Sequence, residues 1–156
     1  MEGEKYALEN DGLVIRTSWL YSTFGNNFVK TMLRLGTERD SLNIISDQIG
    51  TPTYARDLAE VIIYIVSNFE KEKINGLYHF SNSGKATWYD FATEIFAIAN
   101  VNCKTNPIPT TEYPTPAERP KYSLMDKSKI QKDFDVSLKD WKGRLKECLN
   151  LLKTQK

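Results

Sequence analysis

The sequence has few of the residues that build metal sites, disulfide frameworks or membrane spans. Its 156 residues include two cysteines and one histidine, whereas a structural zinc site needs about four ligands. Cys103 and Cys148 stand far apart without a second pair, which predicts two reduced cysteines. The longest apolar run, 61–66, is much shorter than the roughly 20 residues that cross a bilayer. We therefore expect neither a metal centre nor a membrane anchor.

An excess of charge of either sign is also missing. The formal net charge is +1 at pH 7, from 21 basic and 20 acidic side chains, so no basic stripe favours nucleic acid as a partner. The polar start MEGEK does not resemble a secretory signal, and we expect a cytoplasmic protein. With 40% hydrophobic residues, the chain is long enough for one packed domain or a portion of one.

The sequence also lacks the glycine-rich GxGxxG turn that holds a dinucleotide in many α/β proteins. Its strand and helix patterns alternate, and this alternation predicts the α/β class. Two stretches, 48–54 and 105–122, are predicted loops because glycine and proline interrupt them. The predicted strands span 13–15, 42–46 and 76–80. The predicted helices span 1–10, 26–35, 57–69, 87–99, 126–132 and a last segment from 137 onward.

The first group of candidate binding residues stands where the first predicted strand ends. Arg16, Thr17 and Ser18 occupy the strand end, and α/β proteins bind ligands at the carboxyl ends of their strands. Trp19 follows directly, and an indole offers a sugar ring a flat apolar face. A half-buried core role fits the spacing of Trp19 as well.

The second group opens the helix predicted over 26–35. Asn26 and Asn27 follow Gly25, where free backbone amides and the helix dipole favour an anion. Ordinary N-capping by Asn26 is the structural alternative. Gly36 is expected to stop this helix.

The third and fourth groups fall in the two predicted loops. Gln48, Thr51 and Pro52 shape a loop that could bring backbone close to a ligand, or a plain turn into the next helix. Arg119 precedes a stiffening proline, and a guanidinium suits a diphosphate because its planar fork bonds two oxygens. The lone His79 lies within a predicted strand and is expected to be structural.

These groups, in this order, resemble the C-terminal half of the dTDP-4-dehydrorhamnose reductases, a family of extended short-chain dehydrogenases/reductases. The family's catalytic Tyr-x-x-x-Lys pair is absent from this sequence. The resemblance implies an α/β fold with the last strands and helices of a Rossmann domain and a small substrate-binding lobe, forming one truncated unit over 1–156. The blocks that carry it are RTSWLY, GNNFVKTMLRL, DQIGTPTYARDLA, GLYHFSN, TWYDFA and YPTPAERPKYSLMDKSK.

The resemblance also implies an activity and a set of roles. The family reduces dTDP-4-dehydro-L-rhamnose to dTDP-L-rhamnose with NADPH or NADH, and Trp19 would pack on the deoxyhexose. No catalytic residue is implied for this chain, and we expect it to bind the cofactor weakly or not at all. The implied substrate-binding residues are Trp19, Asn26, Asn27, Gln48, Thr51, Pro52 and Arg119. The residues implied to lie near the nicotinamide are Arg16, Thr17 and Ser18.

Two alternatives and one assembly state follow from the same pattern. The chain could be a noncatalytic binding or regulatory subunit with this fold, or part of another nucleotide-sugar reductase or epimerase. In either case the sheet would be incomplete, and an uncovered strand edge invites pairing with another chain. We therefore expect a homodimer.

Overall fold

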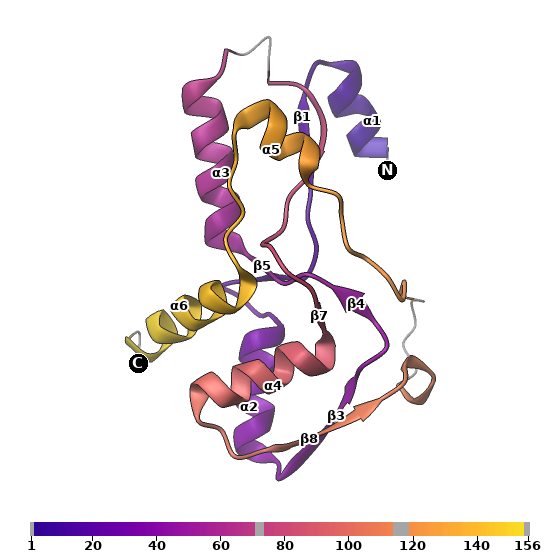
Figure 1. Cartoon of the computed structure of the whole chain (residues 1–156), viewed down its shortest axis with the longest axis vertical. Coiled ribbons are helices and arrows are strands. Elements are labelled where there is room, and N and C mark those ends of the chain that lie inside the picture. Colours follow the sequence, from indigo (N-terminus) through magenta and orange to yellow (C-terminus); the bar gives the residue numbers. More distant parts are fainter. Residues whose placement is uncertain (1, 71–73, 114–118, 155–156) are drawn as a thin grey trace.

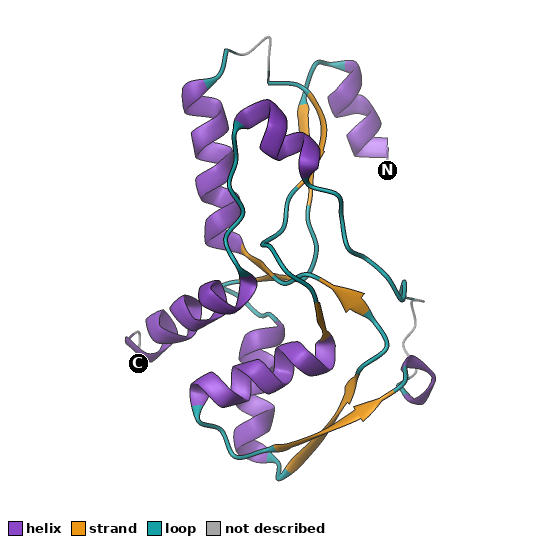
Figure 2. Ribbon diagram, in the orientation of Figure 1, coloured by secondary structure: helices purple, strands orange, loops and turns teal. Residues whose placement is uncertain are grey.

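The computed structural model describes residues 2–70, 74–113 and 119–154. Helices and strands alternate along the chain, as Figures 1 and 2 show. The helices are α1 (Glu2–Glu9), α2 (Phe28–Glu38), α3 (Ala55–Asn68), α4 (Trp88–Ala99), α5 (Ser128–Phe134) and α6 (Trp141–Thr154), with a 3-10 turn η2 (Thr110–Glu112). The strands are β1 (Leu13–Arg16), β2 (Leu20–Tyr21), β3 (Ser41–Ile45), β4 (Ile49–Gly50), β5 (Thr53–Tyr54), β6 (Gly76–His79), β7 (Ala86–Thr87) and β8 (Lys104–Ile108).

The strands form four short pairs, and three of them are parallel. β1 pairs with β6, β2 with β5 and β3 with β8 in parallel, whereas β4 and β7 are antiparallel. Parallel neighbours need long crossover connections, and the chain provides them as helices. The α/β class is therefore confirmed. No helix in the described ranges is both long and apolar enough to cross a membrane.

The predicted loop over 105–122 is wrong at its start, because it contains most of β8. In the β3–β8 register, Ile44 lies opposite Pro107. A proline cannot donate to a strand ladder, but an edge strand tolerates it, and β8 has β3 as its only strand neighbour among the described residues. The predicted loop over 48–54 likewise contains the two-residue strands β4 and β5.

The predicted helix stop at Gly36 is also wrong, since α2 continues to Glu38. An added Cβ at Gly36 would lie 2.6 Å from Cε1 of Phe96 and 2.8 Å from Cγ1 of Val101. Glycine therefore serves packing at this position: its missing side chain lets α2 approach α4 closely.

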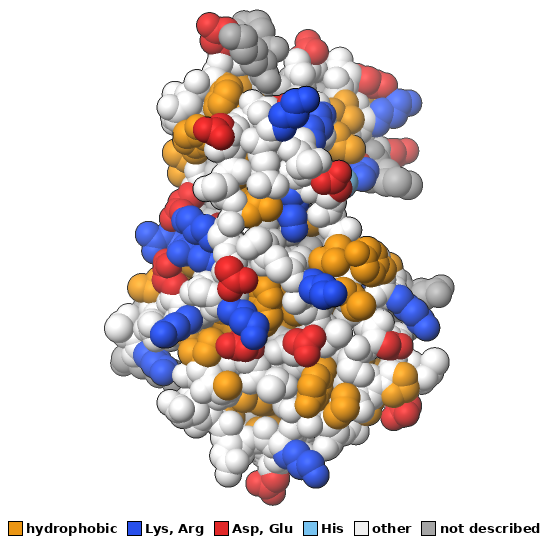
Figure 3. Space-filling model, in the orientation of Figure 1, with side chains coloured by type: hydrophobic (Ala, Val, Ile, Leu, Met, Phe, Trp, Pro, Cys, Tyr) orange, Lys and Arg blue, Asp and Glu red, His pale blue; other side chains and the backbone are white. Residues whose placement is uncertain are grey.

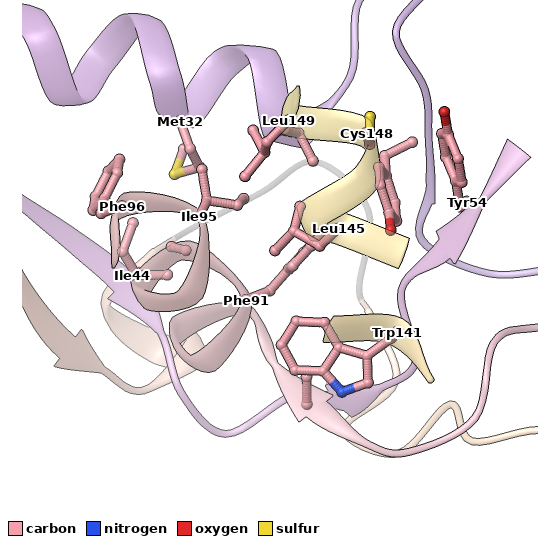
Figure 4. Packing of buried hydrophobic residues seen from close by; sticks show 14 of the residues in the cluster. Met32, Ile44, Tyr54, Phe91, Ile95, Phe96, Trp141, Leu145, Cys148 and Leu149 are labelled. Carbon is pink, nitrogen blue, oxygen red and sulfur yellow. The ribbon is translucent and has the colours of Figure 1, made fainter. Parts of the chain in front are cut away.

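Two groups of buried side chains stabilise the fold. The larger group, here called the large core, is enclosed by α2, α4 and α6 in the lower part of Figure 1. Figure 4 shows side chains from these helices pointing toward one another. The smaller group, here called the small core, lies between α3, α5 and the β1–β6 pair. It consists of Ile65, Tyr78, Phe80, Ile130, Phe134 and Val136.

A buried carboxylate joins the two cores. Asp57 of α3 is only 3% exposed, and its Oδ2 accepts hydrogen bonds from Asn82 Nδ2 at 2.7 Å and from Arg144 Nε at 2.9 Å. Lys139 Nζ lies 3.3 Å from Oδ1. A buried charge is costly unless it is paired and hydrogen-bonded, so this cluster fixes α3 against α6.

Candidate functional site

Three of the four candidate groups meet at one cavity of about 520 Å³. Ser18 and Trp19 reach it from the β1–β2 connection, Gln48 from the β3–β4 connection, and Arg119 from the segment that precedes α5. Residues separated by about a hundred positions in the sequence thus share one wall. The lining residues are Ser18, Trp19, Ile45, Gln48, Trp88, Arg119, Pro120 and Ser123.

Trp19 lies in this cavity as half of an aromatic pair. Its ring stacks on Trp88 with centroids 3.7 Å apart and planes inclined by 10°. The backbone of Trp19 is left-handed, with φ +48°, and its carbonyl accepts a hydrogen bond from Thr53 N at 3.1 Å. Trp88 covers one face of the indole and the Gly50 backbone passes close to the ring, so Trp19 can offer a ligand only the part of its ring that lines the cavity.

Trp88 is the residue of this site that the sequence did not reveal. It begins α4, directly after the cap residue Thr87, where an aromatic side chain gives no sign of whether it faces the core or a cavity. Its position within the TWYDFA block was the one available signal. Phe28 packs against its ring at 4.6 Å between centroids.

Gln48 uses both ends of its amide within the protein. Its Nε2 donates to Thr110 Oγ1 at 3.1 Å, and its Oε1 accepts from Trp88 Nε1 at 3.2 Å. The neighbouring Asp47 accepts from the Thr110 backbone at 2.9 Å and from its hydroxyl at 2.6 Å. The Thr110 hydroxyl bond holds the pKa of the Asp47 carboxyl below its usual value. Gln48 is therefore placed to hold Trp88 and the turn at Thr110.

The loop that follows Gln48 supports the cavity from behind. Thr51 is buried, and its hydroxyl donates to the Gly84 carbonyl at 2.8 Å, while Pro52 is also buried. An added Cβ at Gly50 would lie 2.6 Å from Trp19 Cε2 and 2.7 Å from Ser123 Oγ. Glycine is thus required where the backbone passes the indole, whereas Thr51 and Pro52 do not line the cavity.

The structure does not bring Asn26 and Asn27 to this cavity. Asn27, not Asn26, caps α2: its Oδ1 accepts from Lys30 N at 3.3 Å and its Nδ2 donates to the Ser22 carbonyl at 2.8 Å. Asn26 is exposed. The capping expectation for Asn26 is corrected by one residue, because Asn27 has the extended backbone of a cap residue and its side chain reaches the first turn.

The three residues at the end of β1 have different environments. Arg16 is engaged by Glu4 of α1, with Nε–Oε1 at 2.9 Å and Nη2–Oε2 at 2.6 Å; this contact lowers the pKa of Glu4. Ser18 donates to the Thr51 carbonyl at 3.2 Å. The Thr17 hydroxyl is buried and has no hydrogen-bond partner among the residues that the structure describes. Of the three, Thr17 therefore has a polar atom left for a further group.

The Arg119 group is described only in part. Arg119 and Pro120 line the cavity, and Arg119 is exposed, so its guanidinium can reach an incoming anion. Ala117 and Glu118 lie outside the described residues. Arg119 is the charged side chain in the cavity lining, which gives the site a positive character.

A second cavity of about 570 Å³ adjoins the first. It lies between α2 and β3, and it shares Ile45 and Trp88 with the first cavity. Phe28, Met32 and Leu35 make its apolar wall on α2. The two cavities together offer room for an elongated ligand with an apolar and an anionic part.

Comparison with known proteins gives the same assignment in sequence and in structure. The chain is 45% identical over 150 residues to the dTDP-4-dehydrorhamnose reductase of Escherichia coli K12, a match that covers 91% of this chain and 50% of that protein. The crystal structure of a dTDP-4-dehydrorhamnose reductase from Clostridium acetobutylicum superposes with a TM-score of 0.88 at 42% identity, covering 97% of this chain and 53% of that one. The reductase from Bacillus anthracis, solved in complex with NADP, gives 0.87 at 38% identity, with 96% and 52% covered.

The fold and these matches define the class: the chain has the architecture of the C-terminal half of an extended short-chain dehydrogenase/reductase. The family described as the RmlD substrate binding domain matches residues 1–154, and the chain belongs to it. The chain spans about half the length of the curated relatives that it matches.

Proposed function

We propose that this chain supplies the substrate-binding part of a dTDP-4-dehydrorhamnose reductase, and that its ligand is a dTDP-linked 6-deoxyhexose. The observation that carries the proposal is the cavity in which an aromatic pair and an exposed guanidinium meet. Reductases of this name are similar to the chain over nearly its full length, which supports the choice of ligand.

The chemistry of the lining suits the two ends of such a ligand. The indole face of Trp19 would pack on the apolar face and methyl group of the deoxyhexose. Arg119 would form charge-assisted hydrogen bonds to the diphosphate, for which its planar fork is well suited. Ser18 and Ser123 add hydroxyl groups along the same wall. These residues would orient the sugar and fix the position of its reacting carbon.

The whole enzyme would reduce the 4-keto group of the sugar. NADPH or NADH, when bound, supplies the hydride. The buried Thr17 hydroxyl, which lacks a partner in the described part of the chain, fits a polar group of the nicotinamide at the end of β1. Arg16 fits this role less well, since Glu4 already engages it.

On its own the chain should bind the dTDP-linked sugar without reducing it. Its sequence contains no Tyr-x-x-x-Lys pair to donate and tune the proton. Its free cysteines, Cys103 and Cys148, favour the reducing cytoplasm. Measurable NADPH-dependent reduction of dTDP-4-dehydro-L-rhamnose by the isolated chain would overturn the inactive assignment.

Calorimetric titration with dTDP-L-rhamnose tests the proposed ligand. We expect saturable binding, and we expect Trp19→Ala to weaken it by about tenfold, the size of one lost aromatic contact. Phe24→Ala is the matched control, because Phe24 is an exposed aromatic side chain outside the cavity; it should leave the affinity unchanged. Equal affinity for UDP-glucose or GDP-mannose would favour another nucleotide-sugar enzyme, and no binding of any of the three would contradict the proposal.

A further inference from the structure

Trp88 contacts three neighbouring side chains. It stacks on Trp19, donates its indole hydrogen to Gln48, and packs against Phe28. Its backbone is fixed because it is the first residue of α4, whose start is held by the reciprocal capping bonds of Thr87 and Asp90. The helix start therefore fixes the backbone of Trp88, and the buried Gln48 amide fixes its indole ring.

The ring of Trp19 is held by packing, not by a hydrogen bond. Its left-handed backbone costs a non-glycine residue on the order of 1 kcal/mol, and the described part of the chain gives the Trp19 indole N–H no hydrogen-bond acceptor. The Gly50 backbone passes so close to the ring that an added Cβ would lie 2.6 Å from Trp19 Cε2. The stacking contact with Trp88 is thus the interaction that sets the plane of the Trp19 indole.

We propose that Trp88 is a positioning residue of the sugar site: it acts through Trp19, by stacking on the indole and so fixing the orientation in which that ring lines the cavity. Gln48 has a supporting part, since its amide joins the Trp88 indole to Thr110. This inference rests on the proposed function, because it needs a sugar that packs on Trp19. It assigns to the start of α4 a role beyond core packing.

A double-mutant cycle tests whether Trp88 acts through Trp19. We expect Trp88→Leu to weaken the binding of dTDP-L-rhamnose by about tenfold in the otherwise unsubstituted chain, the size of an aromatic pair. In the Trp19→Ala background the same change should weaken binding by less than about twofold, because coupled residues are not additive. Equal effects in the two backgrounds would overturn the proposal, since a merely structural role does not depend on Trp19.

Circular dichroism provides a second readout that does not require a ligand. Two indoles stacked at 3.7 Å should couple electronically and give a paired positive and negative band in the far ultraviolet. Trp88→Leu should abolish this signal. Trp141→Phe is the matched control, because Trp141 is buried against Phe91 in the large core and not stacked on another indole; it should leave the paired bands in place.

The outcomes separate this proposal from the one on which it rests. A folded Trp88→Leu chain that has lost the paired bands and binds dTDP-L-rhamnose with unchanged affinity would overturn the role of Trp88 alone. Absence of binding by the unsubstituted chain would overturn the proposed function and this role together. If Trp88→Leu fails to fold, Trp88→Phe serves in the same cycle, because it keeps an aromatic ring against Trp19 while it reduces the stacked area and removes the hydrogen bond to Gln48. Its smaller effect should again vanish with Trp19→Ala, and an effect that persists would overturn the proposal.

Discussion

The large core and the small core differ in how completely the chain covers them. Helices α2, α4 and α6 enclose the large core from three directions (Figure 4). The layer around the small core is open: β1 has β6 as its only strand neighbour within the described ranges, and α3 exposes an apolar stripe. Figure 3 shows hydrophobic side chains reaching the surface along α3. The stripe consists of Ile62, Ile63 and Val66.

The residues proposed to bind the sugar and the residues implied for the cofactor lie beside different cores. Trp19 and Trp88 both pack against the large core, so the proposed sugar-binding wall is built on the part that the chain completes by itself. Arg16 and Thr17 stand at the end of β1 in the open layer. We infer that the substrate wall can be formed by this chain alone, whereas the cofactor side needs a further strand beside β1.

Truncation of one buried side chain in each core gives the largest expected effect. Leu145 and Ile130 are both fully buried, the first in the large core and the second in the small core. Leu145→Ala should lower the free energy of unfolding by about 3–5 kcal/mol, and Ile130→Ala by about 2–3 kcal/mol, because an open layer relaxes more readily into a cavity. Urea unfolding measures both values. A larger loss for Ile130→Ala would contradict the comparison.

The pH dependence of the unfolding free energy tests whether the Cys148 thiol is buried away from water in the large core. Burial raises the pKa of the Cys148 thiol from about 9 to about 11. The folded chain therefore favours the neutral thiol, and the resulting stability is present below about pH 9 and is lost as the pH rises toward 11. Between about pH 8 and pH 10.5, Cys148→Ala should reduce the alkaline loss of unfolding free energy by on the order of 1 kcal/mol. Cys103→Ala, which replaces a more exposed thiol, should reduce it less, and equal reductions would contradict the prediction.

The smallest expected change in stability comes from the open layer. Ile63 is 66% exposed on α3, so Ile63→Glu should alter the free energy of unfolding by less than about 0.5 kcal/mol. If the uncovered layer pairs two copies of the chain, the same substitution should weaken the dimer in small-angle scattering and sedimentation. Phe24→Glu is the control, because Phe24 is 78% exposed and lies near the start of α3, outside the apolar stripe. A strictly monomeric unsubstituted chain would contradict the predicted homodimer.

Local signals in the sequence predicted most helices well. Thr87 and Asp90 have the spacing of a capping box at the start of α4, and the structure shows both reciprocal bonds, with Thr87 N to Asp90 Oδ2 at 2.8 Å and Asp90 N to Thr87 Oγ1 at 3.0 Å. The helix predicted over 126–132 lies two residues later, as α5; Lys127 is its cap residue, and Asp126 Oδ1 accepts from Ser128 N at 2.9 Å in the turn that precedes it. Capping and apolar periodicity act within one or two turns, so a sequence window contains all of the interacting groups.

Signals that depend on distant partners were misleading or absent. Pro107 indicated a loop, yet β3 supplies a strand neighbour more than sixty residues earlier in the chain. Gly36 indicated a helix stop, yet its lack of a side chain serves the contact with Phe96. Trp88 gave no sign of a site because its partner Trp19 is remote in sequence. In each case the deciding contact lies outside any local window.

The amino-acid sequence by itself determined the α/β class, the approximate positions of the helices and the blocks that carry the family resemblance, because these depend on neighbours along the chain. It also pointed to Trp19, Gln48 and Arg119, which do share a cavity. Only the tertiary structure decided that Trp19 stacks on Trp88, that Gln48 is engaged by Trp88 and Thr110, and that Asn27 caps a helix. Those outcomes depend on stacking and hydrogen bonds between segments that folding brings together.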